Sequence, residues 1–222
     1  MKVRYLKSAS AKDIAIFGAG GFGREVLTII NAINQIEPTY NVIGFFDDGL
    51  PVGKDVNGYP VLGGKEELNK WKLSLCLVIA VGNPIVKAKI VNGLCNDNLS
   101  FPTLIHPSVI IGDLDYVDIG KGCIICAGCV ITTNIQIRDF VILNLGCTVG
   151  HDTVIGEHSS FMPSVNISGE VDIAERVYVG TGAKIINQLS IGENTIVGAG
   201  AVVVKSLPAN CTAVGVPANV IK

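Results

Sequence analysis

The sequence predicts a small Rossmann-like α/β domain with a parallel sheet, followed by a long parallel β-helix. Two observations carry this prediction. Over about the first 105 residues, short apolar strands alternate with helical segments and glycine-rich turns. From residue 119 to residue 203, an apolar residue then recurs at every sixth position without a gap, which is the signature of a β-solenoid. We therefore expect an α/β domain over residues 1–106 and a β-helix over residues 107–222.

The α/β domain is expected to begin with a strand at residues 13–17 and a helix at residues 24–34, joined by the turn Gly18-Ala19-Gly20-Gly21-Phe22-Gly23. Further strands are expected at residues 42–46, 75–81 and 101–106, with a second helix over residues 85–94. A G-x-G-x-x-G turn between strand and helix lets backbone N–H groups approach a phosphate. There is room for little more than one mononucleotide-binding half, which favours a nucleotide diphosphate over NAD.

The strand at residues 42–46 ends in Asp47 and Asp48, at the edge where open parallel sheets bind ligands. The alternative interpretation of these features is an ordinary turn and a solvated acidic pair.

The solenoid prediction rests on fifteen hexads in one phase. Their apolar sites are Ile119, Ile125, Ile131, Ile137, Leu143, Val149, Ile155, Phe161, Ile167, Ile173, Val179, Ile185, Ile191, Val197 and Val203. A mostly small or branched residue follows each site by four positions. Three hexads form one coil of about 18 residues, so residues 18 apart should lie one above the other in about five coils.

Composition excludes several classes of function. The net charge is −2 and no basic block is present, so we expect no nucleic-acid partner. No apolar run is long enough to span a bilayer and no signal-peptide pattern is seen, which predicts a cytoplasmic protein without membrane insertion. Seven cysteines are present, but Cys123, Cys129 and Cys147 fall on inward repeat positions. They are therefore expected to be buried, reduced thiols, and no metal site is expected.

The chain has three histidines, His106, His151 and His158. A histidine can act as a general base near neutral pH. His151 is followed by Asp152 and occupies an outward hexad position, whereas His158 is expected to be exposed without an adjacent partner. The sequence therefore favours His151 as a candidate base.

The segment from Asn144 to Gly156, LNLGCTVGHDTVIG with its preceding Leu143, resembles the N-x5-6-(V/I)-x-H-(D/E)-x-x-I-G pattern of sugar-modifying hexapeptide-repeat acyltransferases. The glycine turn and the F-x-D-D strand end are similar to those of bacterial nucleotide-amino-sugar N-acetyltransferases and sialic acid O-acetyltransferases. This resemblance spans about residues 13–221. It implies a left-handed β-helix, although parallel crossovers in general are right-handed.

The resemblance also implies roles for individual residues. His151 would be the general base, Asp152 its hydrogen-bond acceptor, and Asn144 part of the same pocket. The residues expected to bind the nucleotide sugar are Gly20, Gly21, Phe22, Asp47, Asp48 and Gly82. Acetyl-CoA would lie between neighbouring subunits of a homotrimer. The residues expected to contact it are Ser160, Gly169, Thr181, Ala199 and Lys205.

Three of these assignments have a specific basis. Gly169 follows His151 by 18 residues, so its N–H could bind the thioester carbonyl. Ser160 stands where many relatives carry a second histidine. Lys205 falls in the column of His151 and could face the phosphates of coenzyme A, partly compensating for Asn219, which replaces a common lysine. Phe161 and Met162 are candidates for the trimer contact.

The leading hypothesis is therefore an acetyl-CoA-dependent N-acetyltransferase that modifies a UDP-linked or similar amino sugar by direct transfer. An O-acetyltransferase of sialic acid is the near alternative. A non-catalytic solenoid that binds a nucleotide sugar is the alternative of another class, and a NAD-dependent enzyme is disfavoured by domain size.

Overall fold

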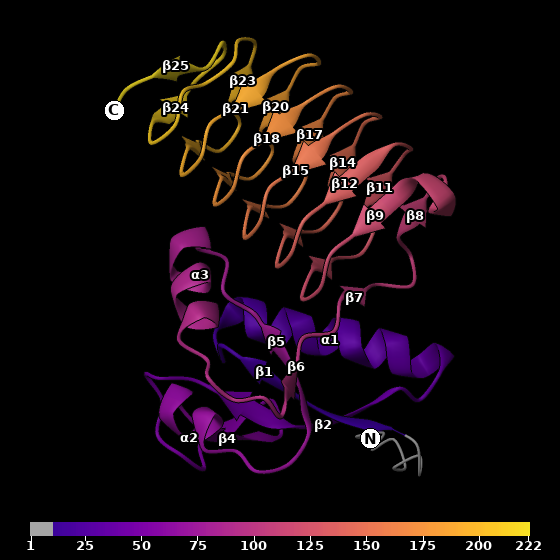
Figure 1. Ribbon diagram of the computed structural model, residues 1–222, viewed down its shortest axis with the longest axis vertical. Coiled ribbons are helices and arrows are strands. Elements are labelled where there is room, and N and C mark those ends of the chain that lie inside the picture. Colours follow the sequence, from indigo (N-terminus) through magenta and orange to yellow (C-terminus); the bar gives the residue numbers. More distant parts are fainter. Residues whose placement is uncertain (1–10) are drawn as a thin grey trace. The chain divides into compact units, whose positions relative to one another are not determined.

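The computed structural model describes residues 11–222, which divide into two compact units (Figure 1). The first unit ends at Ala80 and resumes at Asn92–Pro102; the second comprises Val81–Val91 and Thr103–Lys222. The sequence predicts a single boundary at residue 106, close to the second of these crossings. It does not predict that residues 81–91 belong with the solenoid.

The first unit is built on a six-stranded sheet with the strand order β3-β4-β2-β1-β5-β6. Its strands are β1 (Lys12–Phe17), β2 (Tyr40–Phe46), β3 (Asp55–Val56), β4 (Tyr59–Gly63), β5 (Leu75–Ile79) and β6 (Leu99–Ser100). All neighbours are parallel except the β3–β4 hairpin. Its helices are α1 (Gly21–Ile36) and α2 (Lys65–Asn69). The expected strands near residues 13, 42 and 75 and the first helix are confirmed, whereas the sequence does not predict β3, β4 or α2.

Helix α1 packs on the sheet through its apolar face. Val26 and Ile30 are fully buried, as are Ile14 and Ile16 of the neighbouring strand β1. A side chain at Gly23 would place its Cβ 1.9 Å from the carbonyl oxygen of Gly18. Glycine at position 23 is therefore required for the close approach of α1 to the end of β1.

The second unit is a left-handed parallel β-helix whose short strands stack into three sheets (Figure 1). The first solenoid sheet contains β7 (Leu104–Ile105), β10 (Ile124–Ile125), β13 (Ile142–Leu143), β16 (Ser160–Phe161), β19 (Tyr178–Val179), β22 (Ile196–Val197), β24 (Thr212–Val214) and the antiparallel β25 (Asn219–Val220). The second contains β8 (Ile110–Ile111), β11 (Val130–Ile131), β14 (Thr148–Val149), β17 (Asn166–Ile167), β20 (Lys184–Ile185) and β23 (Val202–Val203). The third contains β9 (Val117–Ile119), β12 (Ile135–Ile137), β15 (Val154–Ile155), β18 (Asp172–Ile173) and β21 (Ser190–Ile191). The expected strand at residues 101–106 is β7 of this solenoid, and a 3₁₀ turn, η1 (Leu114–Tyr116), precedes β9.

Successive coils are related by 18 residues, as the hexad period predicts. Leu143 pairs with Phe161, and Phe161 pairs with Val179. We call the turn from the first to the second sheet the first corner, the turn from the second to the third sheet the second corner, and the turn back to the first sheet the third corner. The spacing changes only near the end, where Ile191 bridges Leu207 and Ile196 pairs with Thr212, 16 residues on.

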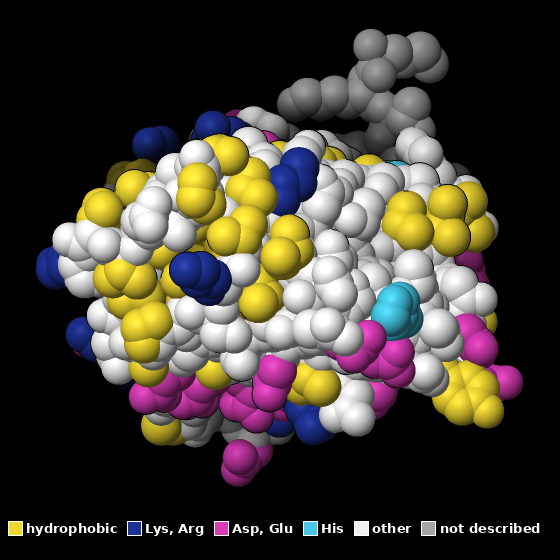
Figure 2. All heavy atoms as spheres, turned by 90° about the horizontal axis from the view of Figure 1, so that it is seen from above, with side chains coloured by type: hydrophobic (Ala, Val, Ile, Leu, Met, Phe, Trp, Pro, Cys, Tyr) yellow, Lys and Arg dark blue, Asp and Glu magenta, His cyan; other side chains and the backbone are white. Residues whose placement is uncertain are grey.

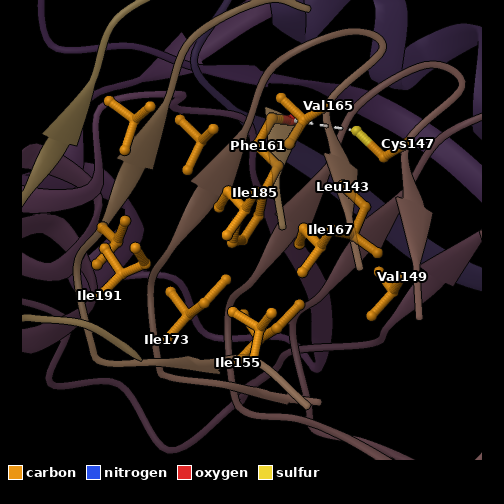
Figure 3. Close-up of a cluster of buried hydrophobic side chains, with 14 of the residues drawn as sticks. Leu143, Cys147, Val149, Ile155, Phe161, Val165, Ile167, Ile173, Ile185 and Ile191 are labelled. Atoms are coloured by element: carbon orange, nitrogen blue, oxygen red, sulfur yellow. Dashed lines mark hydrogen bonds between the residues drawn. The ribbon is translucent and has the colours of Figure 1, made fainter. Parts of the chain in front are cut away.

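The interior of the solenoid is filled by the hexad positions (Figure 3). Fourteen of the fifteen apolar sites are buried, and Ile119 is partly buried. Cys129 and Cys147 are buried free thiols, as expected. Phe161 is fully buried in this core, so its expected role in a subunit contact is wrong. The bulk of Phe161 fills the interior of the prism in place of an aliphatic residue.

Helix α3 (Pro84–Asn92) belongs to the solenoid unit except for its last residue. The Nζ of Lys87 in this helix donates a hydrogen bond to the Oγ of Ser160 on β16. Gly82, just before the helix, lies beside the Met162 side chain, where an added Cβ would be 3.8 Å from the methionine Cε. No helix in the described part of the chain is both long and apolar enough to cross a membrane.

Candidate active site

The glycine turn of the first unit has the geometry of a phosphate-binding turn. Gly20 is the N-cap of α1, and Gly21 is its first residue. A Cβ added at either position would meet no atom within 4 Å, so the space beside the helix N-terminus is open. The carboxylate of Asp47 accepts hydrogen bonds from the N–H groups of Ala19 and Gly49, at 2.8 and 2.9 Å. Asp47 therefore fixes the turn, and the N-terminal end of the α1 dipole favours an anion there.

A pocket of about 540 Å³ lies at this turn and is lined by Gly20, Asp47, Arg24 and Lys54, among others. The two cations were missed at the sequence level. Arg24 follows the glycine motif directly, which offered a signal, but Lys54 precedes a hairpin that the sequence did not predict.

Three of the residues expected to bind the nucleotide sugar have other surroundings. The Asp48 carboxylate accepts a 2.7 Å hydrogen bond from the backbone N–H of Lys65, at the start of α2. Phe22 is partly buried in the first turn of α1. Gly82 belongs to the segment that packs with the solenoid. Asp48 thus holds a neighbouring helix in place.

The second corner of the solenoid presents a histidine–carboxylate pair. The Nδ1 of His151 lies 2.7 Å from the Oδ2 of Asp152, and both side chains are about half exposed. The other carboxylate oxygen of Asp152 accepts a 3.0 Å hydrogen bond from the amide of Asn134, one coil earlier. The bonds from His151 and then Asn134 lower the pKa of Asp152, so the carboxylate is charged near neutral pH. A charged carboxylate only accepts, so Nδ1 carries the proton and Nε2 is available as a base.

Gly169 lies directly against the His151 ring, one coil on. A Cβ at position 169 would be 2.4 Å from the Nε2 of His151 and 2.5 Å from Cε1. Only glycine therefore allows the imidazole this position. The backbone N–H of Gly169 donates to no group in the described part of the chain. The corner thus combines a free imidazole nitrogen with a nearby unused hydrogen-bond donor, as the 18-residue spacing predicts.

The residues implicated in the active site do not all share this corner. Asn144, Thr181 and Ala199 lie on the first corner, separated from His151 by the second sheet. Thr181 and Ala199 are exposed and one coil apart, since the N–H of Gly200 donates to the Thr181 carbonyl. Asn144 is buried, and its side chain accepts a hydrogen bond from the N–H of Leu145. Within one chain, the expected catalytic and cofactor-binding residues therefore occupy two edges of the prism.

Ser160 has an environment that the resemblance did not predict. Its side chain is fully buried, and its Oγ accepts a 2.8 Å hydrogen bond from the Nζ of Lys87. The same ammonium group lies 3.4 Å from the Ser159 carbonyl. Burial lowers the pKa of Lys87 from 10.5 to about 7. In this structure Ser160 has no exposed oxygen with which to contact coenzyme A, and it instead receives the buried lysine of α3.

His158 is buried, and the expectation that it is exposed is wrong. Its ring stacks on Phe140, with centroids 5.2 Å apart, at a third corner where both residues have left-handed backbone. Burial and then the charge of Lys87 lower its pKa from 6.5 to about 4. His158 is therefore neutral near pH 7, and the left-handed corner turns its ring against the protein.

Lys205 is exposed, but its column is not fixed by the 18-residue rule. The regular spacing holds as far as Val203, which pairs with Ile185, and is 16 residues from Ser206 onward, since the N–H of Ser190 donates to the hydroxyl of Ser206. Lys205 falls at the shortening between them. Among residues 11–222, no group of three or more His, Cys, Asp or Glu side chains is placed to hold a metal ion.

Comparisons with known proteins agree with both units. Residues 13–94 match the PglD N-terminal domain family. The chain is 34% identical over 170 residues to a GDP-perosamine N-acetyltransferase of Escherichia coli O157:H7, covering 77% of this chain and 76% of that protein.

Solved structures extend the similarity to almost the whole chain. An asparagine-for-histidine mutant of perosamine N-acetyltransferase from Caulobacter crescentus, in complex with CoA and GDP-perosamine, is 30% identical with a TM-score of 0.86, covering 97% of this chain and 100% of that one. WeeI from Acinetobacter baumannii AYE is 36% identical with a TM-score of 0.85, covering 95% of this chain and 100% of that one. With its glycine-turn domain, its hexapeptide solenoid and these similarities, the chain belongs to the family of bacterial nucleotide-amino-sugar N-acetyltransferases.

Proposed function

We propose that this enzyme transfers an acetyl group from acetyl-CoA to the amine of a nucleotide-linked amino sugar, with His151 as general base. One observation carries the proposal: the His151–Asp152 pair, at 2.7 Å, leaves Nε2 free beside the unused N–H of Gly169. A base and an oxyanion donor at one point are what acyl transfer requires.

The proposed transfer is direct. The sugar amine attacks the thioester carbon, a C–N bond forms, and Nε2 of His151 takes the amine proton. The N–H of Gly169 donates to the oxyanion of the tetrahedral intermediate. The C–S bond then breaks, and the imidazolium returns its proton to the departing sulfur. Asp152 stabilises the imidazolium between these two steps.

We further propose that the active site is completed by a second copy of the chain in a trimer. The base and Gly169 lie on the second corner, whereas Thr181 and Ala199 lie on the first. A closed threefold ring would bring the second corner of one subunit to the first corner of the next. Acetyl-CoA would then lie between them, with its thioester at His151 and with Thr181, Ala199 and the buried Asn144 on the partner's side.

The exposed apolar surface of the last coils supports this assembly. Figure 2 shows hydrophobic side chains gathered over the C-terminal coils. The exposed ones there include Ile186, Ile196, Val204, Val214, Val216, Val220 and Ile221. An apolar patch of this kind on a polar chain is typical of a surface that is covered in the assembly.

The nucleotide is proposed to bind at the glycine turn of the first unit. Its diphosphate would lie at the N-terminus of α1, at Gly20 and Gly21, with Arg24 and Lys54 neutralising its charge. Asp47 shapes this pocket, while Asp48, Phe22 and Gly82 would act around the base or sugar. Relatives from two organisms are named for GDP-perosamine, so a GDP-linked 4-amino sugar is proposed ahead of a UDP-linked one.

Lys205 is proposed to face the phosphates of coenzyme A. It is an exposed cation on the C-terminal coils, and its position at the shortened coil leaves its side chain free of the regular column. Lys205→Ala should raise the Michaelis constant for acetyl-CoA several-fold at low salt with little change in kcat, and the defect should shrink as salt rises.

The experiment that tests the proposed function is a thiol-release assay with acetyl-CoA. GDP-perosamine, UDP-linked 4-amino sugars and free sialic acid are offered as acceptors, and the product is identified by mass. Transfer to the amine of a nucleotide-linked sugar supports the proposal. Acetylation of sialic acid alone would replace it with O-acetyl transfer, and binding of nucleotide sugar without any thiol release would favour a non-catalytic role.

A further inference from the structure

The second corner carries a column of polar side chains that extends beyond the catalytic pair. Asn134, Asp152, Glu170 and Gln188 follow one another at 18-residue intervals, all with left-handed backbone at φ between 55° and 62°. They form two amide–carboxylate pairs. The amide of Asn134 donates to Asp152 at 3.0 Å, and the amide of Gln188 donates to Glu170 at 3.2 Å. Only the first pair includes a carboxylate that also contacts a histidine.

Both oxygens of the Asp152 carboxylate are engaged. Oδ2 lies 2.7 Å from His151 Nδ1, and Oδ1 accepts from Asn134. The Asp152 side chain is 49% exposed, so water competes for each oxygen. A carboxylate held by one bond alone can rotate about χ2 into solvent, because that torsion is broad. The second bond, from the preceding coil, opposes this rotation.

We propose that Asn134 is a positioning residue for the general base. It holds the Asp152 carboxylate toward Nδ1 of His151, which keeps the Nδ1–H tautomer and leaves Nε2 to accept the proton. Asparagine suits the position because it adopts left-handed backbone more readily than most residues and because its amide supplies the N–H donor. This inference rests on the proposed role of His151.

Other charged groups also surround this column. Glu170 follows Asp152 one coil on, and its backbone N–H donates to the His151 carbonyl at 2.8 Å. Asp115 and Asp118 line the pocket of about 520 Å³ that Asn134 also lines. These carboxylates are present in every variant below, so differences between variants report on position 134 or 188 alone.

The test compares three variants with the wild-type enzyme. Asn134→Gly removes the amide without backbone strain, Asn134→Asp keeps the shape but replaces the donor with a second carboxylate, and Gln188→Gly is the matched control in the same column. The measurements are kcat, the Michaelis constant for acetyl-CoA, and the pKa of the His151 imidazole by NMR titration. His151→Ala assigns the resonance.

Asn134→Gly should lower kcat about 10-fold, at the lower end of the range for a hydrogen bond to a charged group, and should leave the Michaelis constant for acetyl-CoA unchanged. It should also lower the pKa of His151, because the carboxylate then leaves the imidazole part of the time. Asn134→Asp should raise that pKa, since a second negative charge favours the imidazolium. Gln188→Gly should alter neither quantity.

An Asn134→Gly enzyme with wild-type kcat and an unchanged His151 pKa would overturn the proposal, as would an equal loss in Gln188→Gly. The NMR titration needs no turnover. If the wild-type protein transfers no acetyl group while the His151 pKa still responds to position 134 as stated, the positioning contact stands and the proposed function fails.

Discussion

The buried Lys87 predicts an unusual dependence of stability on pH. The ammonium group is 1% exposed and has hydrogen-bond partners in Ser160 and Ser159 but no counter-ion among the residues that the structure describes. Burial lowers its pKa from 10.5 to about 7. Since each pKa unit corresponds to 1.36 kcal/mol, charging Lys87 in the folded state is disfavoured by about 5 kcal/mol.

The sign of the effect follows from proton counting. Between pH 7 and pH 10.5, the unfolded chain holds a proton on Lys87 more often than the folded protein does. The free energy of unfolding therefore rises with pH in this window, by at most about 1.4 kcal/mol per pH unit from this group. Below about pH 7 both states are protonated, and the full cost is present.

Lys87→Met removes the titrating group and keeps a similar apolar stem. It also removes one hydrogen bond, worth about 1 kcal/mol. We therefore expect the variant to be more stable than the wild type near pH 7 by a few kcal/mol, and slightly less stable above pH 10. The difference in unfolding free energy should shrink steadily between these values.

The assay is urea unfolding at several pH values from 7 to 10, where His158 does not titrate. Lys89→Met is the matched control, because Lys89 lies on the same helix and is exposed. Parallel pH profiles for wild type and Lys87→Met would refute the reasoning, and would mean that the ammonium group is solvated or paired in the folded protein.

Three further predictions concern other positions. Gly169→Ala should lower kcat about 100-fold without loss of folding by circular dichroism, because its Cβ would displace the His151 ring; an unchanged kcat would show that the ring lies elsewhere during catalysis. His158→Asn should reduce acid sensitivity. The pKa of about 4 means that wild-type stability is lost as the pH falls from 6.5 to 4, by up to about 3 kcal/mol, and identical acid unfolding curves would contradict this. Gly23→Ala should destabilise the protein by about 1–3 kcal/mol in urea unfolding, since the Cβ would overlap the Gly18 carbonyl; a loss below 0.5 kcal/mol would mean that α1 shifts freely.

The sequence predicts most of the solenoid because its period is repeated fifteen times. One hexad in phase fixes the next, so the inward positions, the 18-residue columns and the pairing of His151 with Gly169 all follow from counting. The rule fails where the period fails. The coil between Val203 and Ser206 is shorter by two residues, and nothing in the hexad pattern itself marks the change before Pro208.

The buried polar groups could not be predicted from local pattern. In α3, Ile85 and Val86 are exposed while Lys87 is buried, which reverses the usual order of hydrophobicity. The reason is tertiary, since the face that carries Lys87 meets the hydroxyl of Ser160 on a strand 73 residues later. His158 illustrates the same limit, because its hexad position suggests an outward side chain, but the left-handed corner stacks it on Phe140.

The central claim is that His151, aligned by Asp152, is the base for acetyl transfer, and steady-state turnover of His151→Ala tests it most directly. His106→Ala is the control, because His106 is also accessible but pairs with the hydroxyl of Ser108 and not with a carboxylate. With acetyl-CoA and the best acceptor saturating, the account predicts a fall in kcat of about 10²–10⁴-fold for His151→Ala and little change for His106→Ala. A His151→Ala enzyme that retains wild-type kcat would contradict it.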